Sequence, residues 1–257
     1  MMLVRPVALI TGASRRIGIA AAIATTLARD GWDVATTYYR PYDATMPWGS
    51  TAGEADAIAD EIRAAGARCL AVEADLADPT APAQLFDEAE RVLGPVTALI
   101  LSHCQSVDSA ILDTTLESFD RHMAINARAT WLLVREFGRR YRGAHGAGRI
   151  LSVTSDHVAF NLPYGASKGA MDRIVLAAAR EFAALGVTAN VINPGATDTG
   201  WMTAEFMAEI AQQTPLGRVG TPQDVANLAR FLCSPEGGWV NGQIIYSNGG
   251  IKSPALP

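Results

Sequence analysis

Short apolar runs alternate with longer amphipathic stretches along the whole chain. The runs that we expect to be strands are Val7–Ile10, Val34–Thr37, Cys69–Glu73, Ala98–Leu101, Ile150–Thr154, Thr188–Ile192 and Ile244–Tyr246. Several are apolar throughout, as strands are when helices cover both faces of a parallel sheet. Strand alternating with helix at this spacing predicts βαβ units with right-handed crossovers. The pattern therefore predicts one α/β domain over residues 1–257, with a doubly wound, mostly parallel, seven-stranded sheet.

The predicted helices have recognisable ends. Four glycines directly follow helical stretches: Gly31, Gly66, Gly94 and Gly186. A left-handed residue commonly ends a helix at this position. Thr51 and Glu54 have the spacing of a capping box, which predicts a helix start at Thr51.

The composition indicates in which cellular compartment the protein works and which classes of partner it lacks. No apolar run reaches the roughly 18 residues of a membrane span, and the N-terminus lacks a signal-peptide pattern. The net charge of −5 disfavours nucleic acid as a partner. The three cysteines are widely spaced and show no metal-ligand spacing. We therefore expect reduced thiols, no metal, and a cytoplasmic protein without membrane or nucleic-acid partners.

A glycine turn joins the first strand to the first helix and reads Thr11-Gly12-Ala13-Ser14-Arg15-Arg16-Ile17-Gly18. Glycines let the backbone approach a pyrophosphate, and the helix N-terminus supplies free N–H groups. The position of the turn, more than its glycines, predicts a Rossmann dinucleotide site. The predicted cofactor contacts are Gly12, Ser14, Arg15, Arg16, Ile17 and Gly18.

The end of the second strand bears on the choice between NADH and NADPH. An acidic residue there would accept from the ribose 2′-hydroxyl and repel a 2′-phosphate. The segment instead ends in Arg40, and the first acid is Asp43. Arg15 and Arg40 are expected to clamp the 2′-phosphate, since guanidinium suits bidentate phosphate contacts. NADPH/NADP+ is thus favoured over NADH. The long Arg40–Ser50 loop leaves open a different arrangement of the residues around the ribose.

Tyr164 and Lys168 are four residues apart, on one face of a predicted helix. Reduction of a carbonyl needs a proton donor at its oxygen, and tyrosine, with a pKa of about 10, is a poor acid–base catalyst at neutral pH. A lysine ammonium one turn away would lower that pKa. The pair predicts acid–base catalysis by Tyr164.

Together these motifs resemble the short-chain dehydrogenase/reductase family over nearly the whole chain. The glycine turn is similar to the family's TGxxxGxG, with Arg16 at the middle glycine as in pteridine reductases. The resemblance implies that Asp75 and Leu76 contact adenine, that Asn126 holds a water in a proton relay, and that Ser155 binds the substrate carbonyl. It also implies cofactor contacts from Asn126, Tyr164 and Lys168, and from the segment that contains Pro194, Gly195, Thr197 and Thr199.

Two departures from the family pattern leave alternatives open. Nine positions separate Ser155 from Tyr164, fewer than is common, so Thr154 or Asp156 competes with Ser155 for the serine role. The family's NNAG reads Leu101-Ser102-His103-Cys104 here, which removes a glycine that allows close backbone approach. For His103 and His157 we expect structural or rim positions, since Tyr164 and Lys168 already supply proton transfer.

The function implied by the resemblance is NADPH-dependent reduction of a ketone, with Tyr164 as proton donor. The implied substrate is a small-molecule carbonyl, free or carrier-bound: a 3-oxoacyl thioester or a secondary-metabolite ketone. Reduction of a heterocyclic C=N bond and a weakly active NADP(H)-binding sensor or scaffold are the alternatives. Residues 197–215, with Trp201, Met202, Phe206 and Met207, are the expected substrate lid. The resemblance also implies a homodimer or homotetramer that pairs Leu116–Arg140 and Pro163–Leu185.

Overall fold

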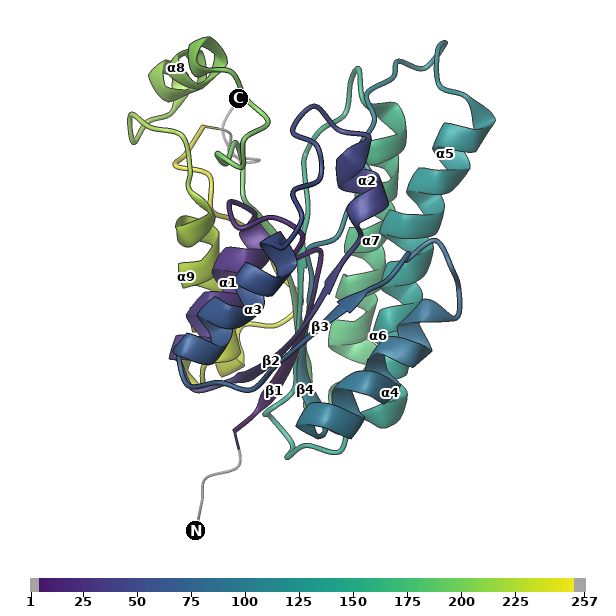
Figure 1. The fold of residues 1–257 in the computed structure, drawn as a ribbon, viewed down its shortest axis with the longest axis vertical. Coiled ribbons are helices and arrows are strands. Elements are labelled where there is room, and N and C mark those ends of the chain that lie inside the picture. Colours follow the sequence, from purple (N-terminus) through teal and green to yellow (C-terminus); the bar gives the residue numbers. More distant parts are fainter. Residues whose placement is uncertain (1–4, 252–257) are drawn as a thin grey trace.

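The computed structural model describes residues 5–251 as a central sheet between two layers of helices (Figure 1). The sheet is fully parallel, with the strand order β3-β2-β1-β4-β5-β6-β7. The strands are β1 (Val7–Thr11), β2 (Asp33–Tyr38), β3 (Cys69–Glu73), β4 (Val96–Leu101), β5 (Arg149–Val153), β6 (Thr188–Asn193) and β7 (Ile244–Tyr246). Each coincides with a predicted apolar run. The predicted doubly wound α/β fold is confirmed.

Two helical layers cover the two faces of the sheet. The helices are α1 (Ile19–Arg29), α2 (Arg40–Ala44), α3 (Glu54–Ala64), α4 (Ala81–Leu93), α5 (Leu116–His122), α6 (Ala129–Arg140), α7 (Leu162–Glu181), α8 (Ala204–Gln213) and α9 (Pro222–Cys233). Shorter turns are η1 (Met123–Arg128, π-helical), η2 (Ala183–Leu185) and η3 (Glu236–Trp239). Helices α1, α3 and α9 form one layer, and α4, α6 and α7 form the other (Figure 1).

The core explains why these segments become helices. Helix α4 buries Leu85, Phe86, Ala89 and Leu93, the apolar stripe that a helix presents to a sheet. Helix α1 buries Ala20, Ala24 and Ala28 at four-residue spacing, and the small side chains leave room for α9. Each face of the sheet therefore has its own apolar core.

The helix ends agree with the sequence analysis except at α3. Gly31, Gly66, Gly94 and Gly186 all have positive φ and follow helical segments, as predicted. The predicted capping box of Thr51 and Glu54 is wrong, because α3 begins at Glu54 behind Gly53, whose φ is +84°. The Glu54 carboxylate instead accepts from the backbone N–H of Arg16 in the glycine turn, at 3.5 Å.

The functional cleft lies where β1 and β4 are neighbours in the sheet. The connections that leave these two strands run to opposite faces, so a crevice opens at their carboxyl ends. Two segments rise beyond this edge: residues 39–50, here called the strap, which contain α2, and residues 197–215, the lid, which contain α8 (Figure 1). Every residue of α8 is described and none of them is buried, so this helix stands apart from the core.

Candidate active site

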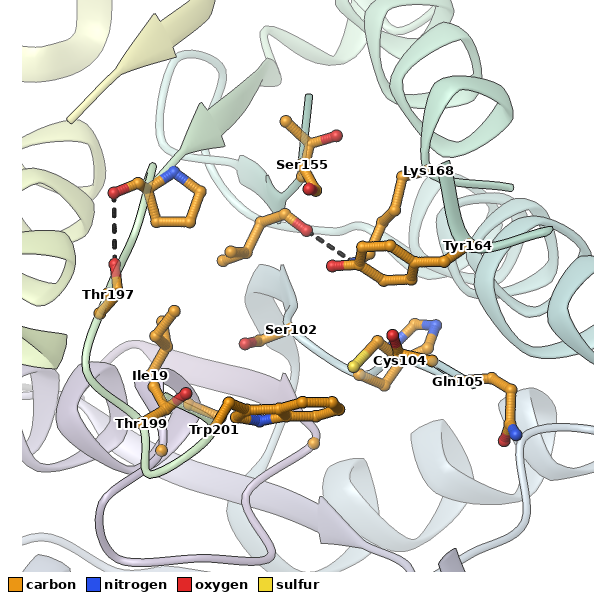
Figure 2. A pocket seen from close by; sticks show the side chains of 18 of the residues that line it. Ile19, Ser102, Cys104, Gln105, Ser155, Tyr164, Lys168, Thr197, Thr199 and Trp201 are labelled. Atoms are coloured by element: carbon orange, nitrogen blue, oxygen red, sulfur yellow. Dashed lines mark hydrogen bonds between the residues drawn. The ribbon is translucent and has the colours of Figure 1, made fainter. Parts of the chain in front are cut away.

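A cavity of about 780 Å³ opens along the carboxyl edge of the sheet. It is lined by the glycine turn after β1, the strap after β2, the segments after β4 and β5, and the lid after β6. Figure 2 shows Ser155, Tyr164 and Lys168 on one side of it, and Thr199 and Trp201 on another. The fold thus collects in one place most of the side chains that the sequence analysis selected.

Helix α7 positions Tyr164 and Lys168 one turn apart at its N-terminal end. Lys168 is only 2% exposed, and its Nζ donates to the backbone oxygen of Val153 at 2.8 Å. The same Nζ lies 5.7 Å from the centroid of the Tyr164 ring. Burial lowers the pKa of Lys168, since a charged ammonium is poorly solvated there.

The sequence analysis expected Lys168 to lower the pKa of Tyr164. The groups of the protein instead raise it. Burial raises the pKa of Tyr164 above its usual range, and a hydrogen bond with the Ser155 side chain opposes this only in part. The physical reason is that Lys168 is itself buried and directs its ammonium at the Val153 carbonyl. Tyr164 is therefore a protonated phenol at neutral pH, the form that donates a proton.

Ser155 keeps its place despite the short connection to Tyr164. Its Oγ accepts from the backbone N–H of His157 at 3.2 Å, and its side chain lowers the pKa of Tyr164. The loop fits because Gly165 has no side chain: a Cβ there would lie 2.1 Å from the His157 carbonyl oxygen. Phe160 turns the chain with a left-handed φ of +63°. Of the three candidates for the serine role, Ser155 is the one whose side chain acts on Tyr164, since it lowers the pKa of that phenol.

Asn126 has a different set of contacts from the expected water relay. It lies in η1 and is fully buried. Its Oδ1 accepts from the backbone N–H of Gln105 at 2.7 Å, and its Nδ2 donates to the Gln105 carbonyl and to Ser167 Oγ. The side chain thus fixes the segment after β4 against α7. Its part in a relay stays a prediction.

His103 holds together the segment that replaces NNAG. Its Nδ1 lies 2.6 Å from Thr11 Oγ1, and its Nε2 lies 3.1 Å from the Ile125 carbonyl oxygen. A carbonyl only accepts, so Nε2 carries the proton and Thr11 donates to Nδ1. Burial lowers the pKa of His103 to about 3, which keeps the ring neutral. The backbone approach also survives, since a Cβ on Gly12 would lie 2.8 Å from His103 Cα.

The three candidate arginines have different partners. Arg16 pairs with Glu61 on α3 and does not line the cavity. The Arg40 guanidinium donates to both carboxylate oxygens of Glu73, at the end of β3. Arg40 also lies outside the cavity. Arg15 lines the cavity: its Nη1 donates to the Thr199 carbonyl at 3.0 Å, and its guanidinium lies 4.3 Å from the centroid of the Trp48 ring. Among the described residues, no carboxylate pairs with Arg15, so its charge is available to a phosphate.

The other expected cofactor residues mostly reach the cavity. Those that line it are Gly12, Ser14, Gly18, Asp75, Leu76, Pro194, Gly195, Thr197 and Thr199. Ile17 and Asn126 do not: the Ile17 side chain is exposed, and Asn126 is fully buried behind the cavity lining. Asp75 accepts from the backbone N–H of Ala77 at 2.8 Å, so it also caps the turn after β3.

The strap carries side chains that the sequence analysis did not select. Tyr42 bonds the backbone of Ser106 through its hydroxyl, and Trp48 Nε1 donates to Asp43 Oδ1, both at 3.2 Å. The Trp48 ring also contacts Trp201 of the lid, with 4.5 Å between ring centroids. The only signal in the sequence was the length of the Arg40–Ser50 loop.

The lid supplies an apolar wall. Trp201, Met202 and Phe206 line the cavity as expected, with Ile210 in place of Met207. The structure adds two carboxamides from other segments, Gln105 and Asn161, to the lining. The described residues hold no cluster of side chains suited to bind a metal ion, and no described helix is both long and apolar enough to cross a bilayer.

Known proteins of similar sequence and structure share this architecture. Residues 12–252 match the family model described as enoyl-(acyl carrier protein) reductase. The chain is 36% identical over 250 residues to the uncharacterized oxidoreductase YjdA of Bacillus subtilis, which covers 95% of this chain and 96% of that protein. It is 34% identical over 256 residues to NADPH-dependent aldehyde reductase 2, chloroplastic, of Arabidopsis thaliana, with coverage of 95% and 93%.

Among solved structures, a short-chain dehydrogenase from Burkholderia cenocepacia in complex with NADP superposes with a TM-score of 0.84. The two sequences are 33% identical, and the match covers 96% of this chain and 98% of that one. The family model, the relatives and the shared fold agree with the motifs of the glycine turn and of Tyr164 and Lys168. The chain belongs to the short-chain dehydrogenase/reductase family of oxidoreductases.

Proposed function

We propose that this oxidoreductase uses NADPH to reduce an aldehyde or ketone to an alcohol, with Tyr164 as proton donor. The observation that carries the proposal is one cavity that holds Ser155, Tyr164 and Lys168 together with Arg15, whose charge has no carboxylate partner among residues 5–251. A relative named as an NADPH-dependent aldehyde reductase supports both the reaction and the cofactor. The 3-oxoacyl thioester and secondary-metabolite ketones remain the substrate predictions.

The residues present fit a dinucleotide phosphate. Gly12, with a φ of +85°, and Gly18, at the start of α1, leave the backbone of the turn open to a pyrophosphate. Arg15 offers a guanidinium for a phosphate group without first breaking an ion pair. Arg40 would have to leave Glu73 to do the same. We therefore assign the main phosphate contact to Arg15.

The chemistry that NADPH supplies when bound is a hydride for the carbonyl carbon. The Tyr164 hydroxyl donates its proton to the carbonyl oxygen, so the product is a neutral alcohol. The Ser155 hydroxyl donates a hydrogen bond to the same oxygen as negative charge develops on it. The Lys168 ammonium, one turn behind, stabilises the phenolate that the transfer leaves on Tyr164.

The two alternatives have less support in the site. Reduction of a C=N bond was suggested by Arg16, whose guanidinium is bound to Glu61 outside the cavity. A sensor or scaffold was suggested by the short loop and the altered NNAG segment. Gly165 and His103 accommodate both changes around Ser155 and Tyr164.

Cofactor titration and the Tyr164→Phe variant test the proposal. NADPH should bind more tightly than NADH when nicotinamide fluorescence is followed. Tyr164→Phe should lose about 100-fold or more in kcat, the scale of a positioned proton donor, and still bind NADPH. Full turnover in this variant would contradict the assigned role, and failure to bind either cofactor would refute the reductase.

Assembly and cellular location stay predictions. A homodimer or homotetramer would place α6 and α7, the longest helices of the two predicted pairing segments, against a second copy. Trp131 on α6 is 49% exposed in the single chain and would become buried. Light scattering that reports a monomer at working concentrations would end this prediction.

A further inference from the structure

Asp172 lies on the same side of α7 as the catalytic pair. It follows Lys168 by four residues, as Lys168 follows Tyr164, so the three side chains lie along one face of the helix. Asp172 is half-buried, and its Oδ1 is buried without a hydrogen-bond donor among the described residues. Such an oxygen is poorly solvated, so a negative charge on it needs a cation nearby. The proposed reaction assigns this carboxylate no role.

Strand β5 presents neutral side chains to this face of α7. Ser152 and Thr154 point to the same side of the strand as Ile150, whose side chain shares an apolar core with Val175 of α7. Both hydroxyls are buried without a hydrogen-bond partner among the described residues. Asp172 therefore meets uncharged groups on the strand, and its counter-charge must come from elsewhere.

Lys168 has no carboxylate paired with it among the described residues. Its ammonium donates to the Val153 carbonyl at 2.8 Å and lies 3.9 Å from Met171 Sδ. Burial lowers the pKa of Lys168, and Cys104 and Asp172 oppose this lowering. Burial raises the pKa of the Cys104 thiol, so that thiol stays neutral at neutral pH. Asp172 is therefore the carboxylate whose charge reaches Lys168.

Lys168 is the buried cation that acts on Asp172 in return. Burial raises the pKa of Asp172, and the Thr154 hydroxyl, Lys168 and the exposed Arg173 lower it. Strand β6, which also packs on α7, has no ionisable side chain. The ionisable side chains of α5, η1 and α6 are exposed or have partners of their own: exposed Glu117 and Asp120, His122 on the backbone of Ser118 and Val107, Arg121 on Asp75, Arg128 on the Ala77 carbonyl, and Arg135, Arg139 and Arg140 on Glu136.

We propose that Asp172 is a positioning residue for the proton transfer: its carboxylate keeps the buried Lys168 ammonium protonated and so extends to higher pH the range in which Tyr164 donates. The inference rests on the proposed reductase function and adds a third charged group to it. Reduction uses the form in which Tyr164 and Lys168 both hold their protons. A negative charge nearby favours this form over either form that has lost a proton, so its removal should move that loss to lower pH.

Coulomb's law gives the size of the effect. Side chains four residues apart on a helix have Cβ atoms roughly 5–6 Å apart. At that separation, two unit charges change each other's proton affinity by about threefold in water and by about 100-fold at an effective dielectric constant near 20. Asp172 is half-buried, so we expect an effect between these limits, about tenfold, which is about one pH unit.

Lys168 and Lys252 are the two lysines of the sequence, so the charge of Lys168 can be followed directly. In protein labelled with carbon-13 lysine, the Cε signal reports the protonation of each amine, and Lys252→Arg assigns the two signals. In Asp172→Asn and Asp172→Ser, the titration midpoint of Lys168 should lie about one pH unit below that of the parent. Asp172→Glu keeps the charge and should restore most of the difference. Glu181→Gln, at the exposed C-terminal end of the same helix, is the matched control and should change nothing.

The pH profile of kcat tests the consequence for proton transfer. With NADPH and benzaldehyde, the alkaline limb of Asp172→Asn should move to lower pH by the same amount as the Lys168 midpoint. With NADP+ and benzyl alcohol, the rising limb should move with it, because oxidation needs the form that reduction leaves behind. A purely structural role would lower kcat at every pH and move neither limb.

The outcomes separate the inference from the function beneath it. A Lys168 midpoint that stays at the parent value in both neutral variants, or that moves equally in Glu181→Gln, overturns the inference. A midpoint that moves while both limbs stay in place overturns the role of Asp172 in proton transfer. If NADPH binds but no aldehyde or ketone is reduced, the proposed reductase fails and that role fails with it, whereas the Lys168 midpoint still decides whether Asp172 holds the ammonium charged.

Discussion

Replacing Arg15 with methionine should remove most of the preference for NADPH over NADH. The substitution deletes the guanidinium and keeps an unbranched chain against Trp48. Charge-assisted hydrogen bonds contribute about 1.5–3 kcal/mol, or about 10- to 150-fold in Kd. On binding a phosphate, Arg15 gives up its bond to the Thr199 carbonyl and part of its contact with Trp48. The net loss should therefore lie near the low end, about tenfold, with NADH affinity almost unchanged.

The assay is fluorescence titration of both cofactors with the parent, Arg15→Met and Arg40→Met. Arg40 is the matched control, because its ion pair with Glu73 is exposed and such pairs contribute little. Added salt should weaken NADPH binding in the parent more than in Arg15→Met, since screening acts on the charge that was removed. Equal losses for NADPH and NADH would show that Arg15 binds the shared pyrophosphate. A larger loss in Arg40→Met would show that Arg40 leaves Glu73 on binding.

Two further predictions concern His103 and Gly165. Because the pKa of His103 is lowered to about 3, the unfolded chain takes up a proton below pH ~6.5 that the folded protein refuses. The contribution of His103 to the free energy of unfolding should therefore fall by about 2 kcal/mol from pH 7 to pH 5. Urea unfolding at the two pH values should show a fall that is about 2 kcal/mol smaller in His103→Asn than in the parent. Equal falls in both proteins would show that His103 is not buried as neutral imidazole. Gly165→Ala should lower the unfolding free energy by about 1–3 kcal/mol and reduce kcat, because the new Cβ displaces the His157 carbonyl. Gly169 lies in the same helix with open space around it, so Gly169→Ala should raise the unfolding free energy by about 0.5–1 kcal/mol. Equal effects of the two substitutions would contradict the packing of the short loop.

The sheet could be predicted from the sequence because each strand produces a recognisable pattern over a few consecutive residues. Strands β1 and β4 are covered by helices on both faces, so they appear as continuous apolar runs. The Tyr164 and Lys168 pair is equally local, since four residues in a helix fix their relation. The glycine turn was recognisable because it lies between a strand and a helix.

The rest of the site depends on contacts between distant residues. Arg40 is drawn away from the cavity because the β2–β3 register places Glu73 beside Tyr38. Nothing near Asn126 in the chain reveals that Gln105 and Ser167 occupy its amide. The ends of the strap are likewise fixed by Ser106 and Trp201, far along the sequence. Register and long loops set these contacts, and neither is encoded in a short pattern.

The contact between Trp48 and Trp201 also bears on the lifetime of bound ligands. Trp48 follows β2 and Trp201 follows β6, so the two rings join opposite halves of the sheet above its carboxyl edge. If this contact has to open for a ligand to enter, it must also open for the ligand to leave, so it would slow both rates equally and leave the dissociation constant unchanged. The consequence would be for residence time: a ligand behind the two rings would leave more slowly without binding more tightly.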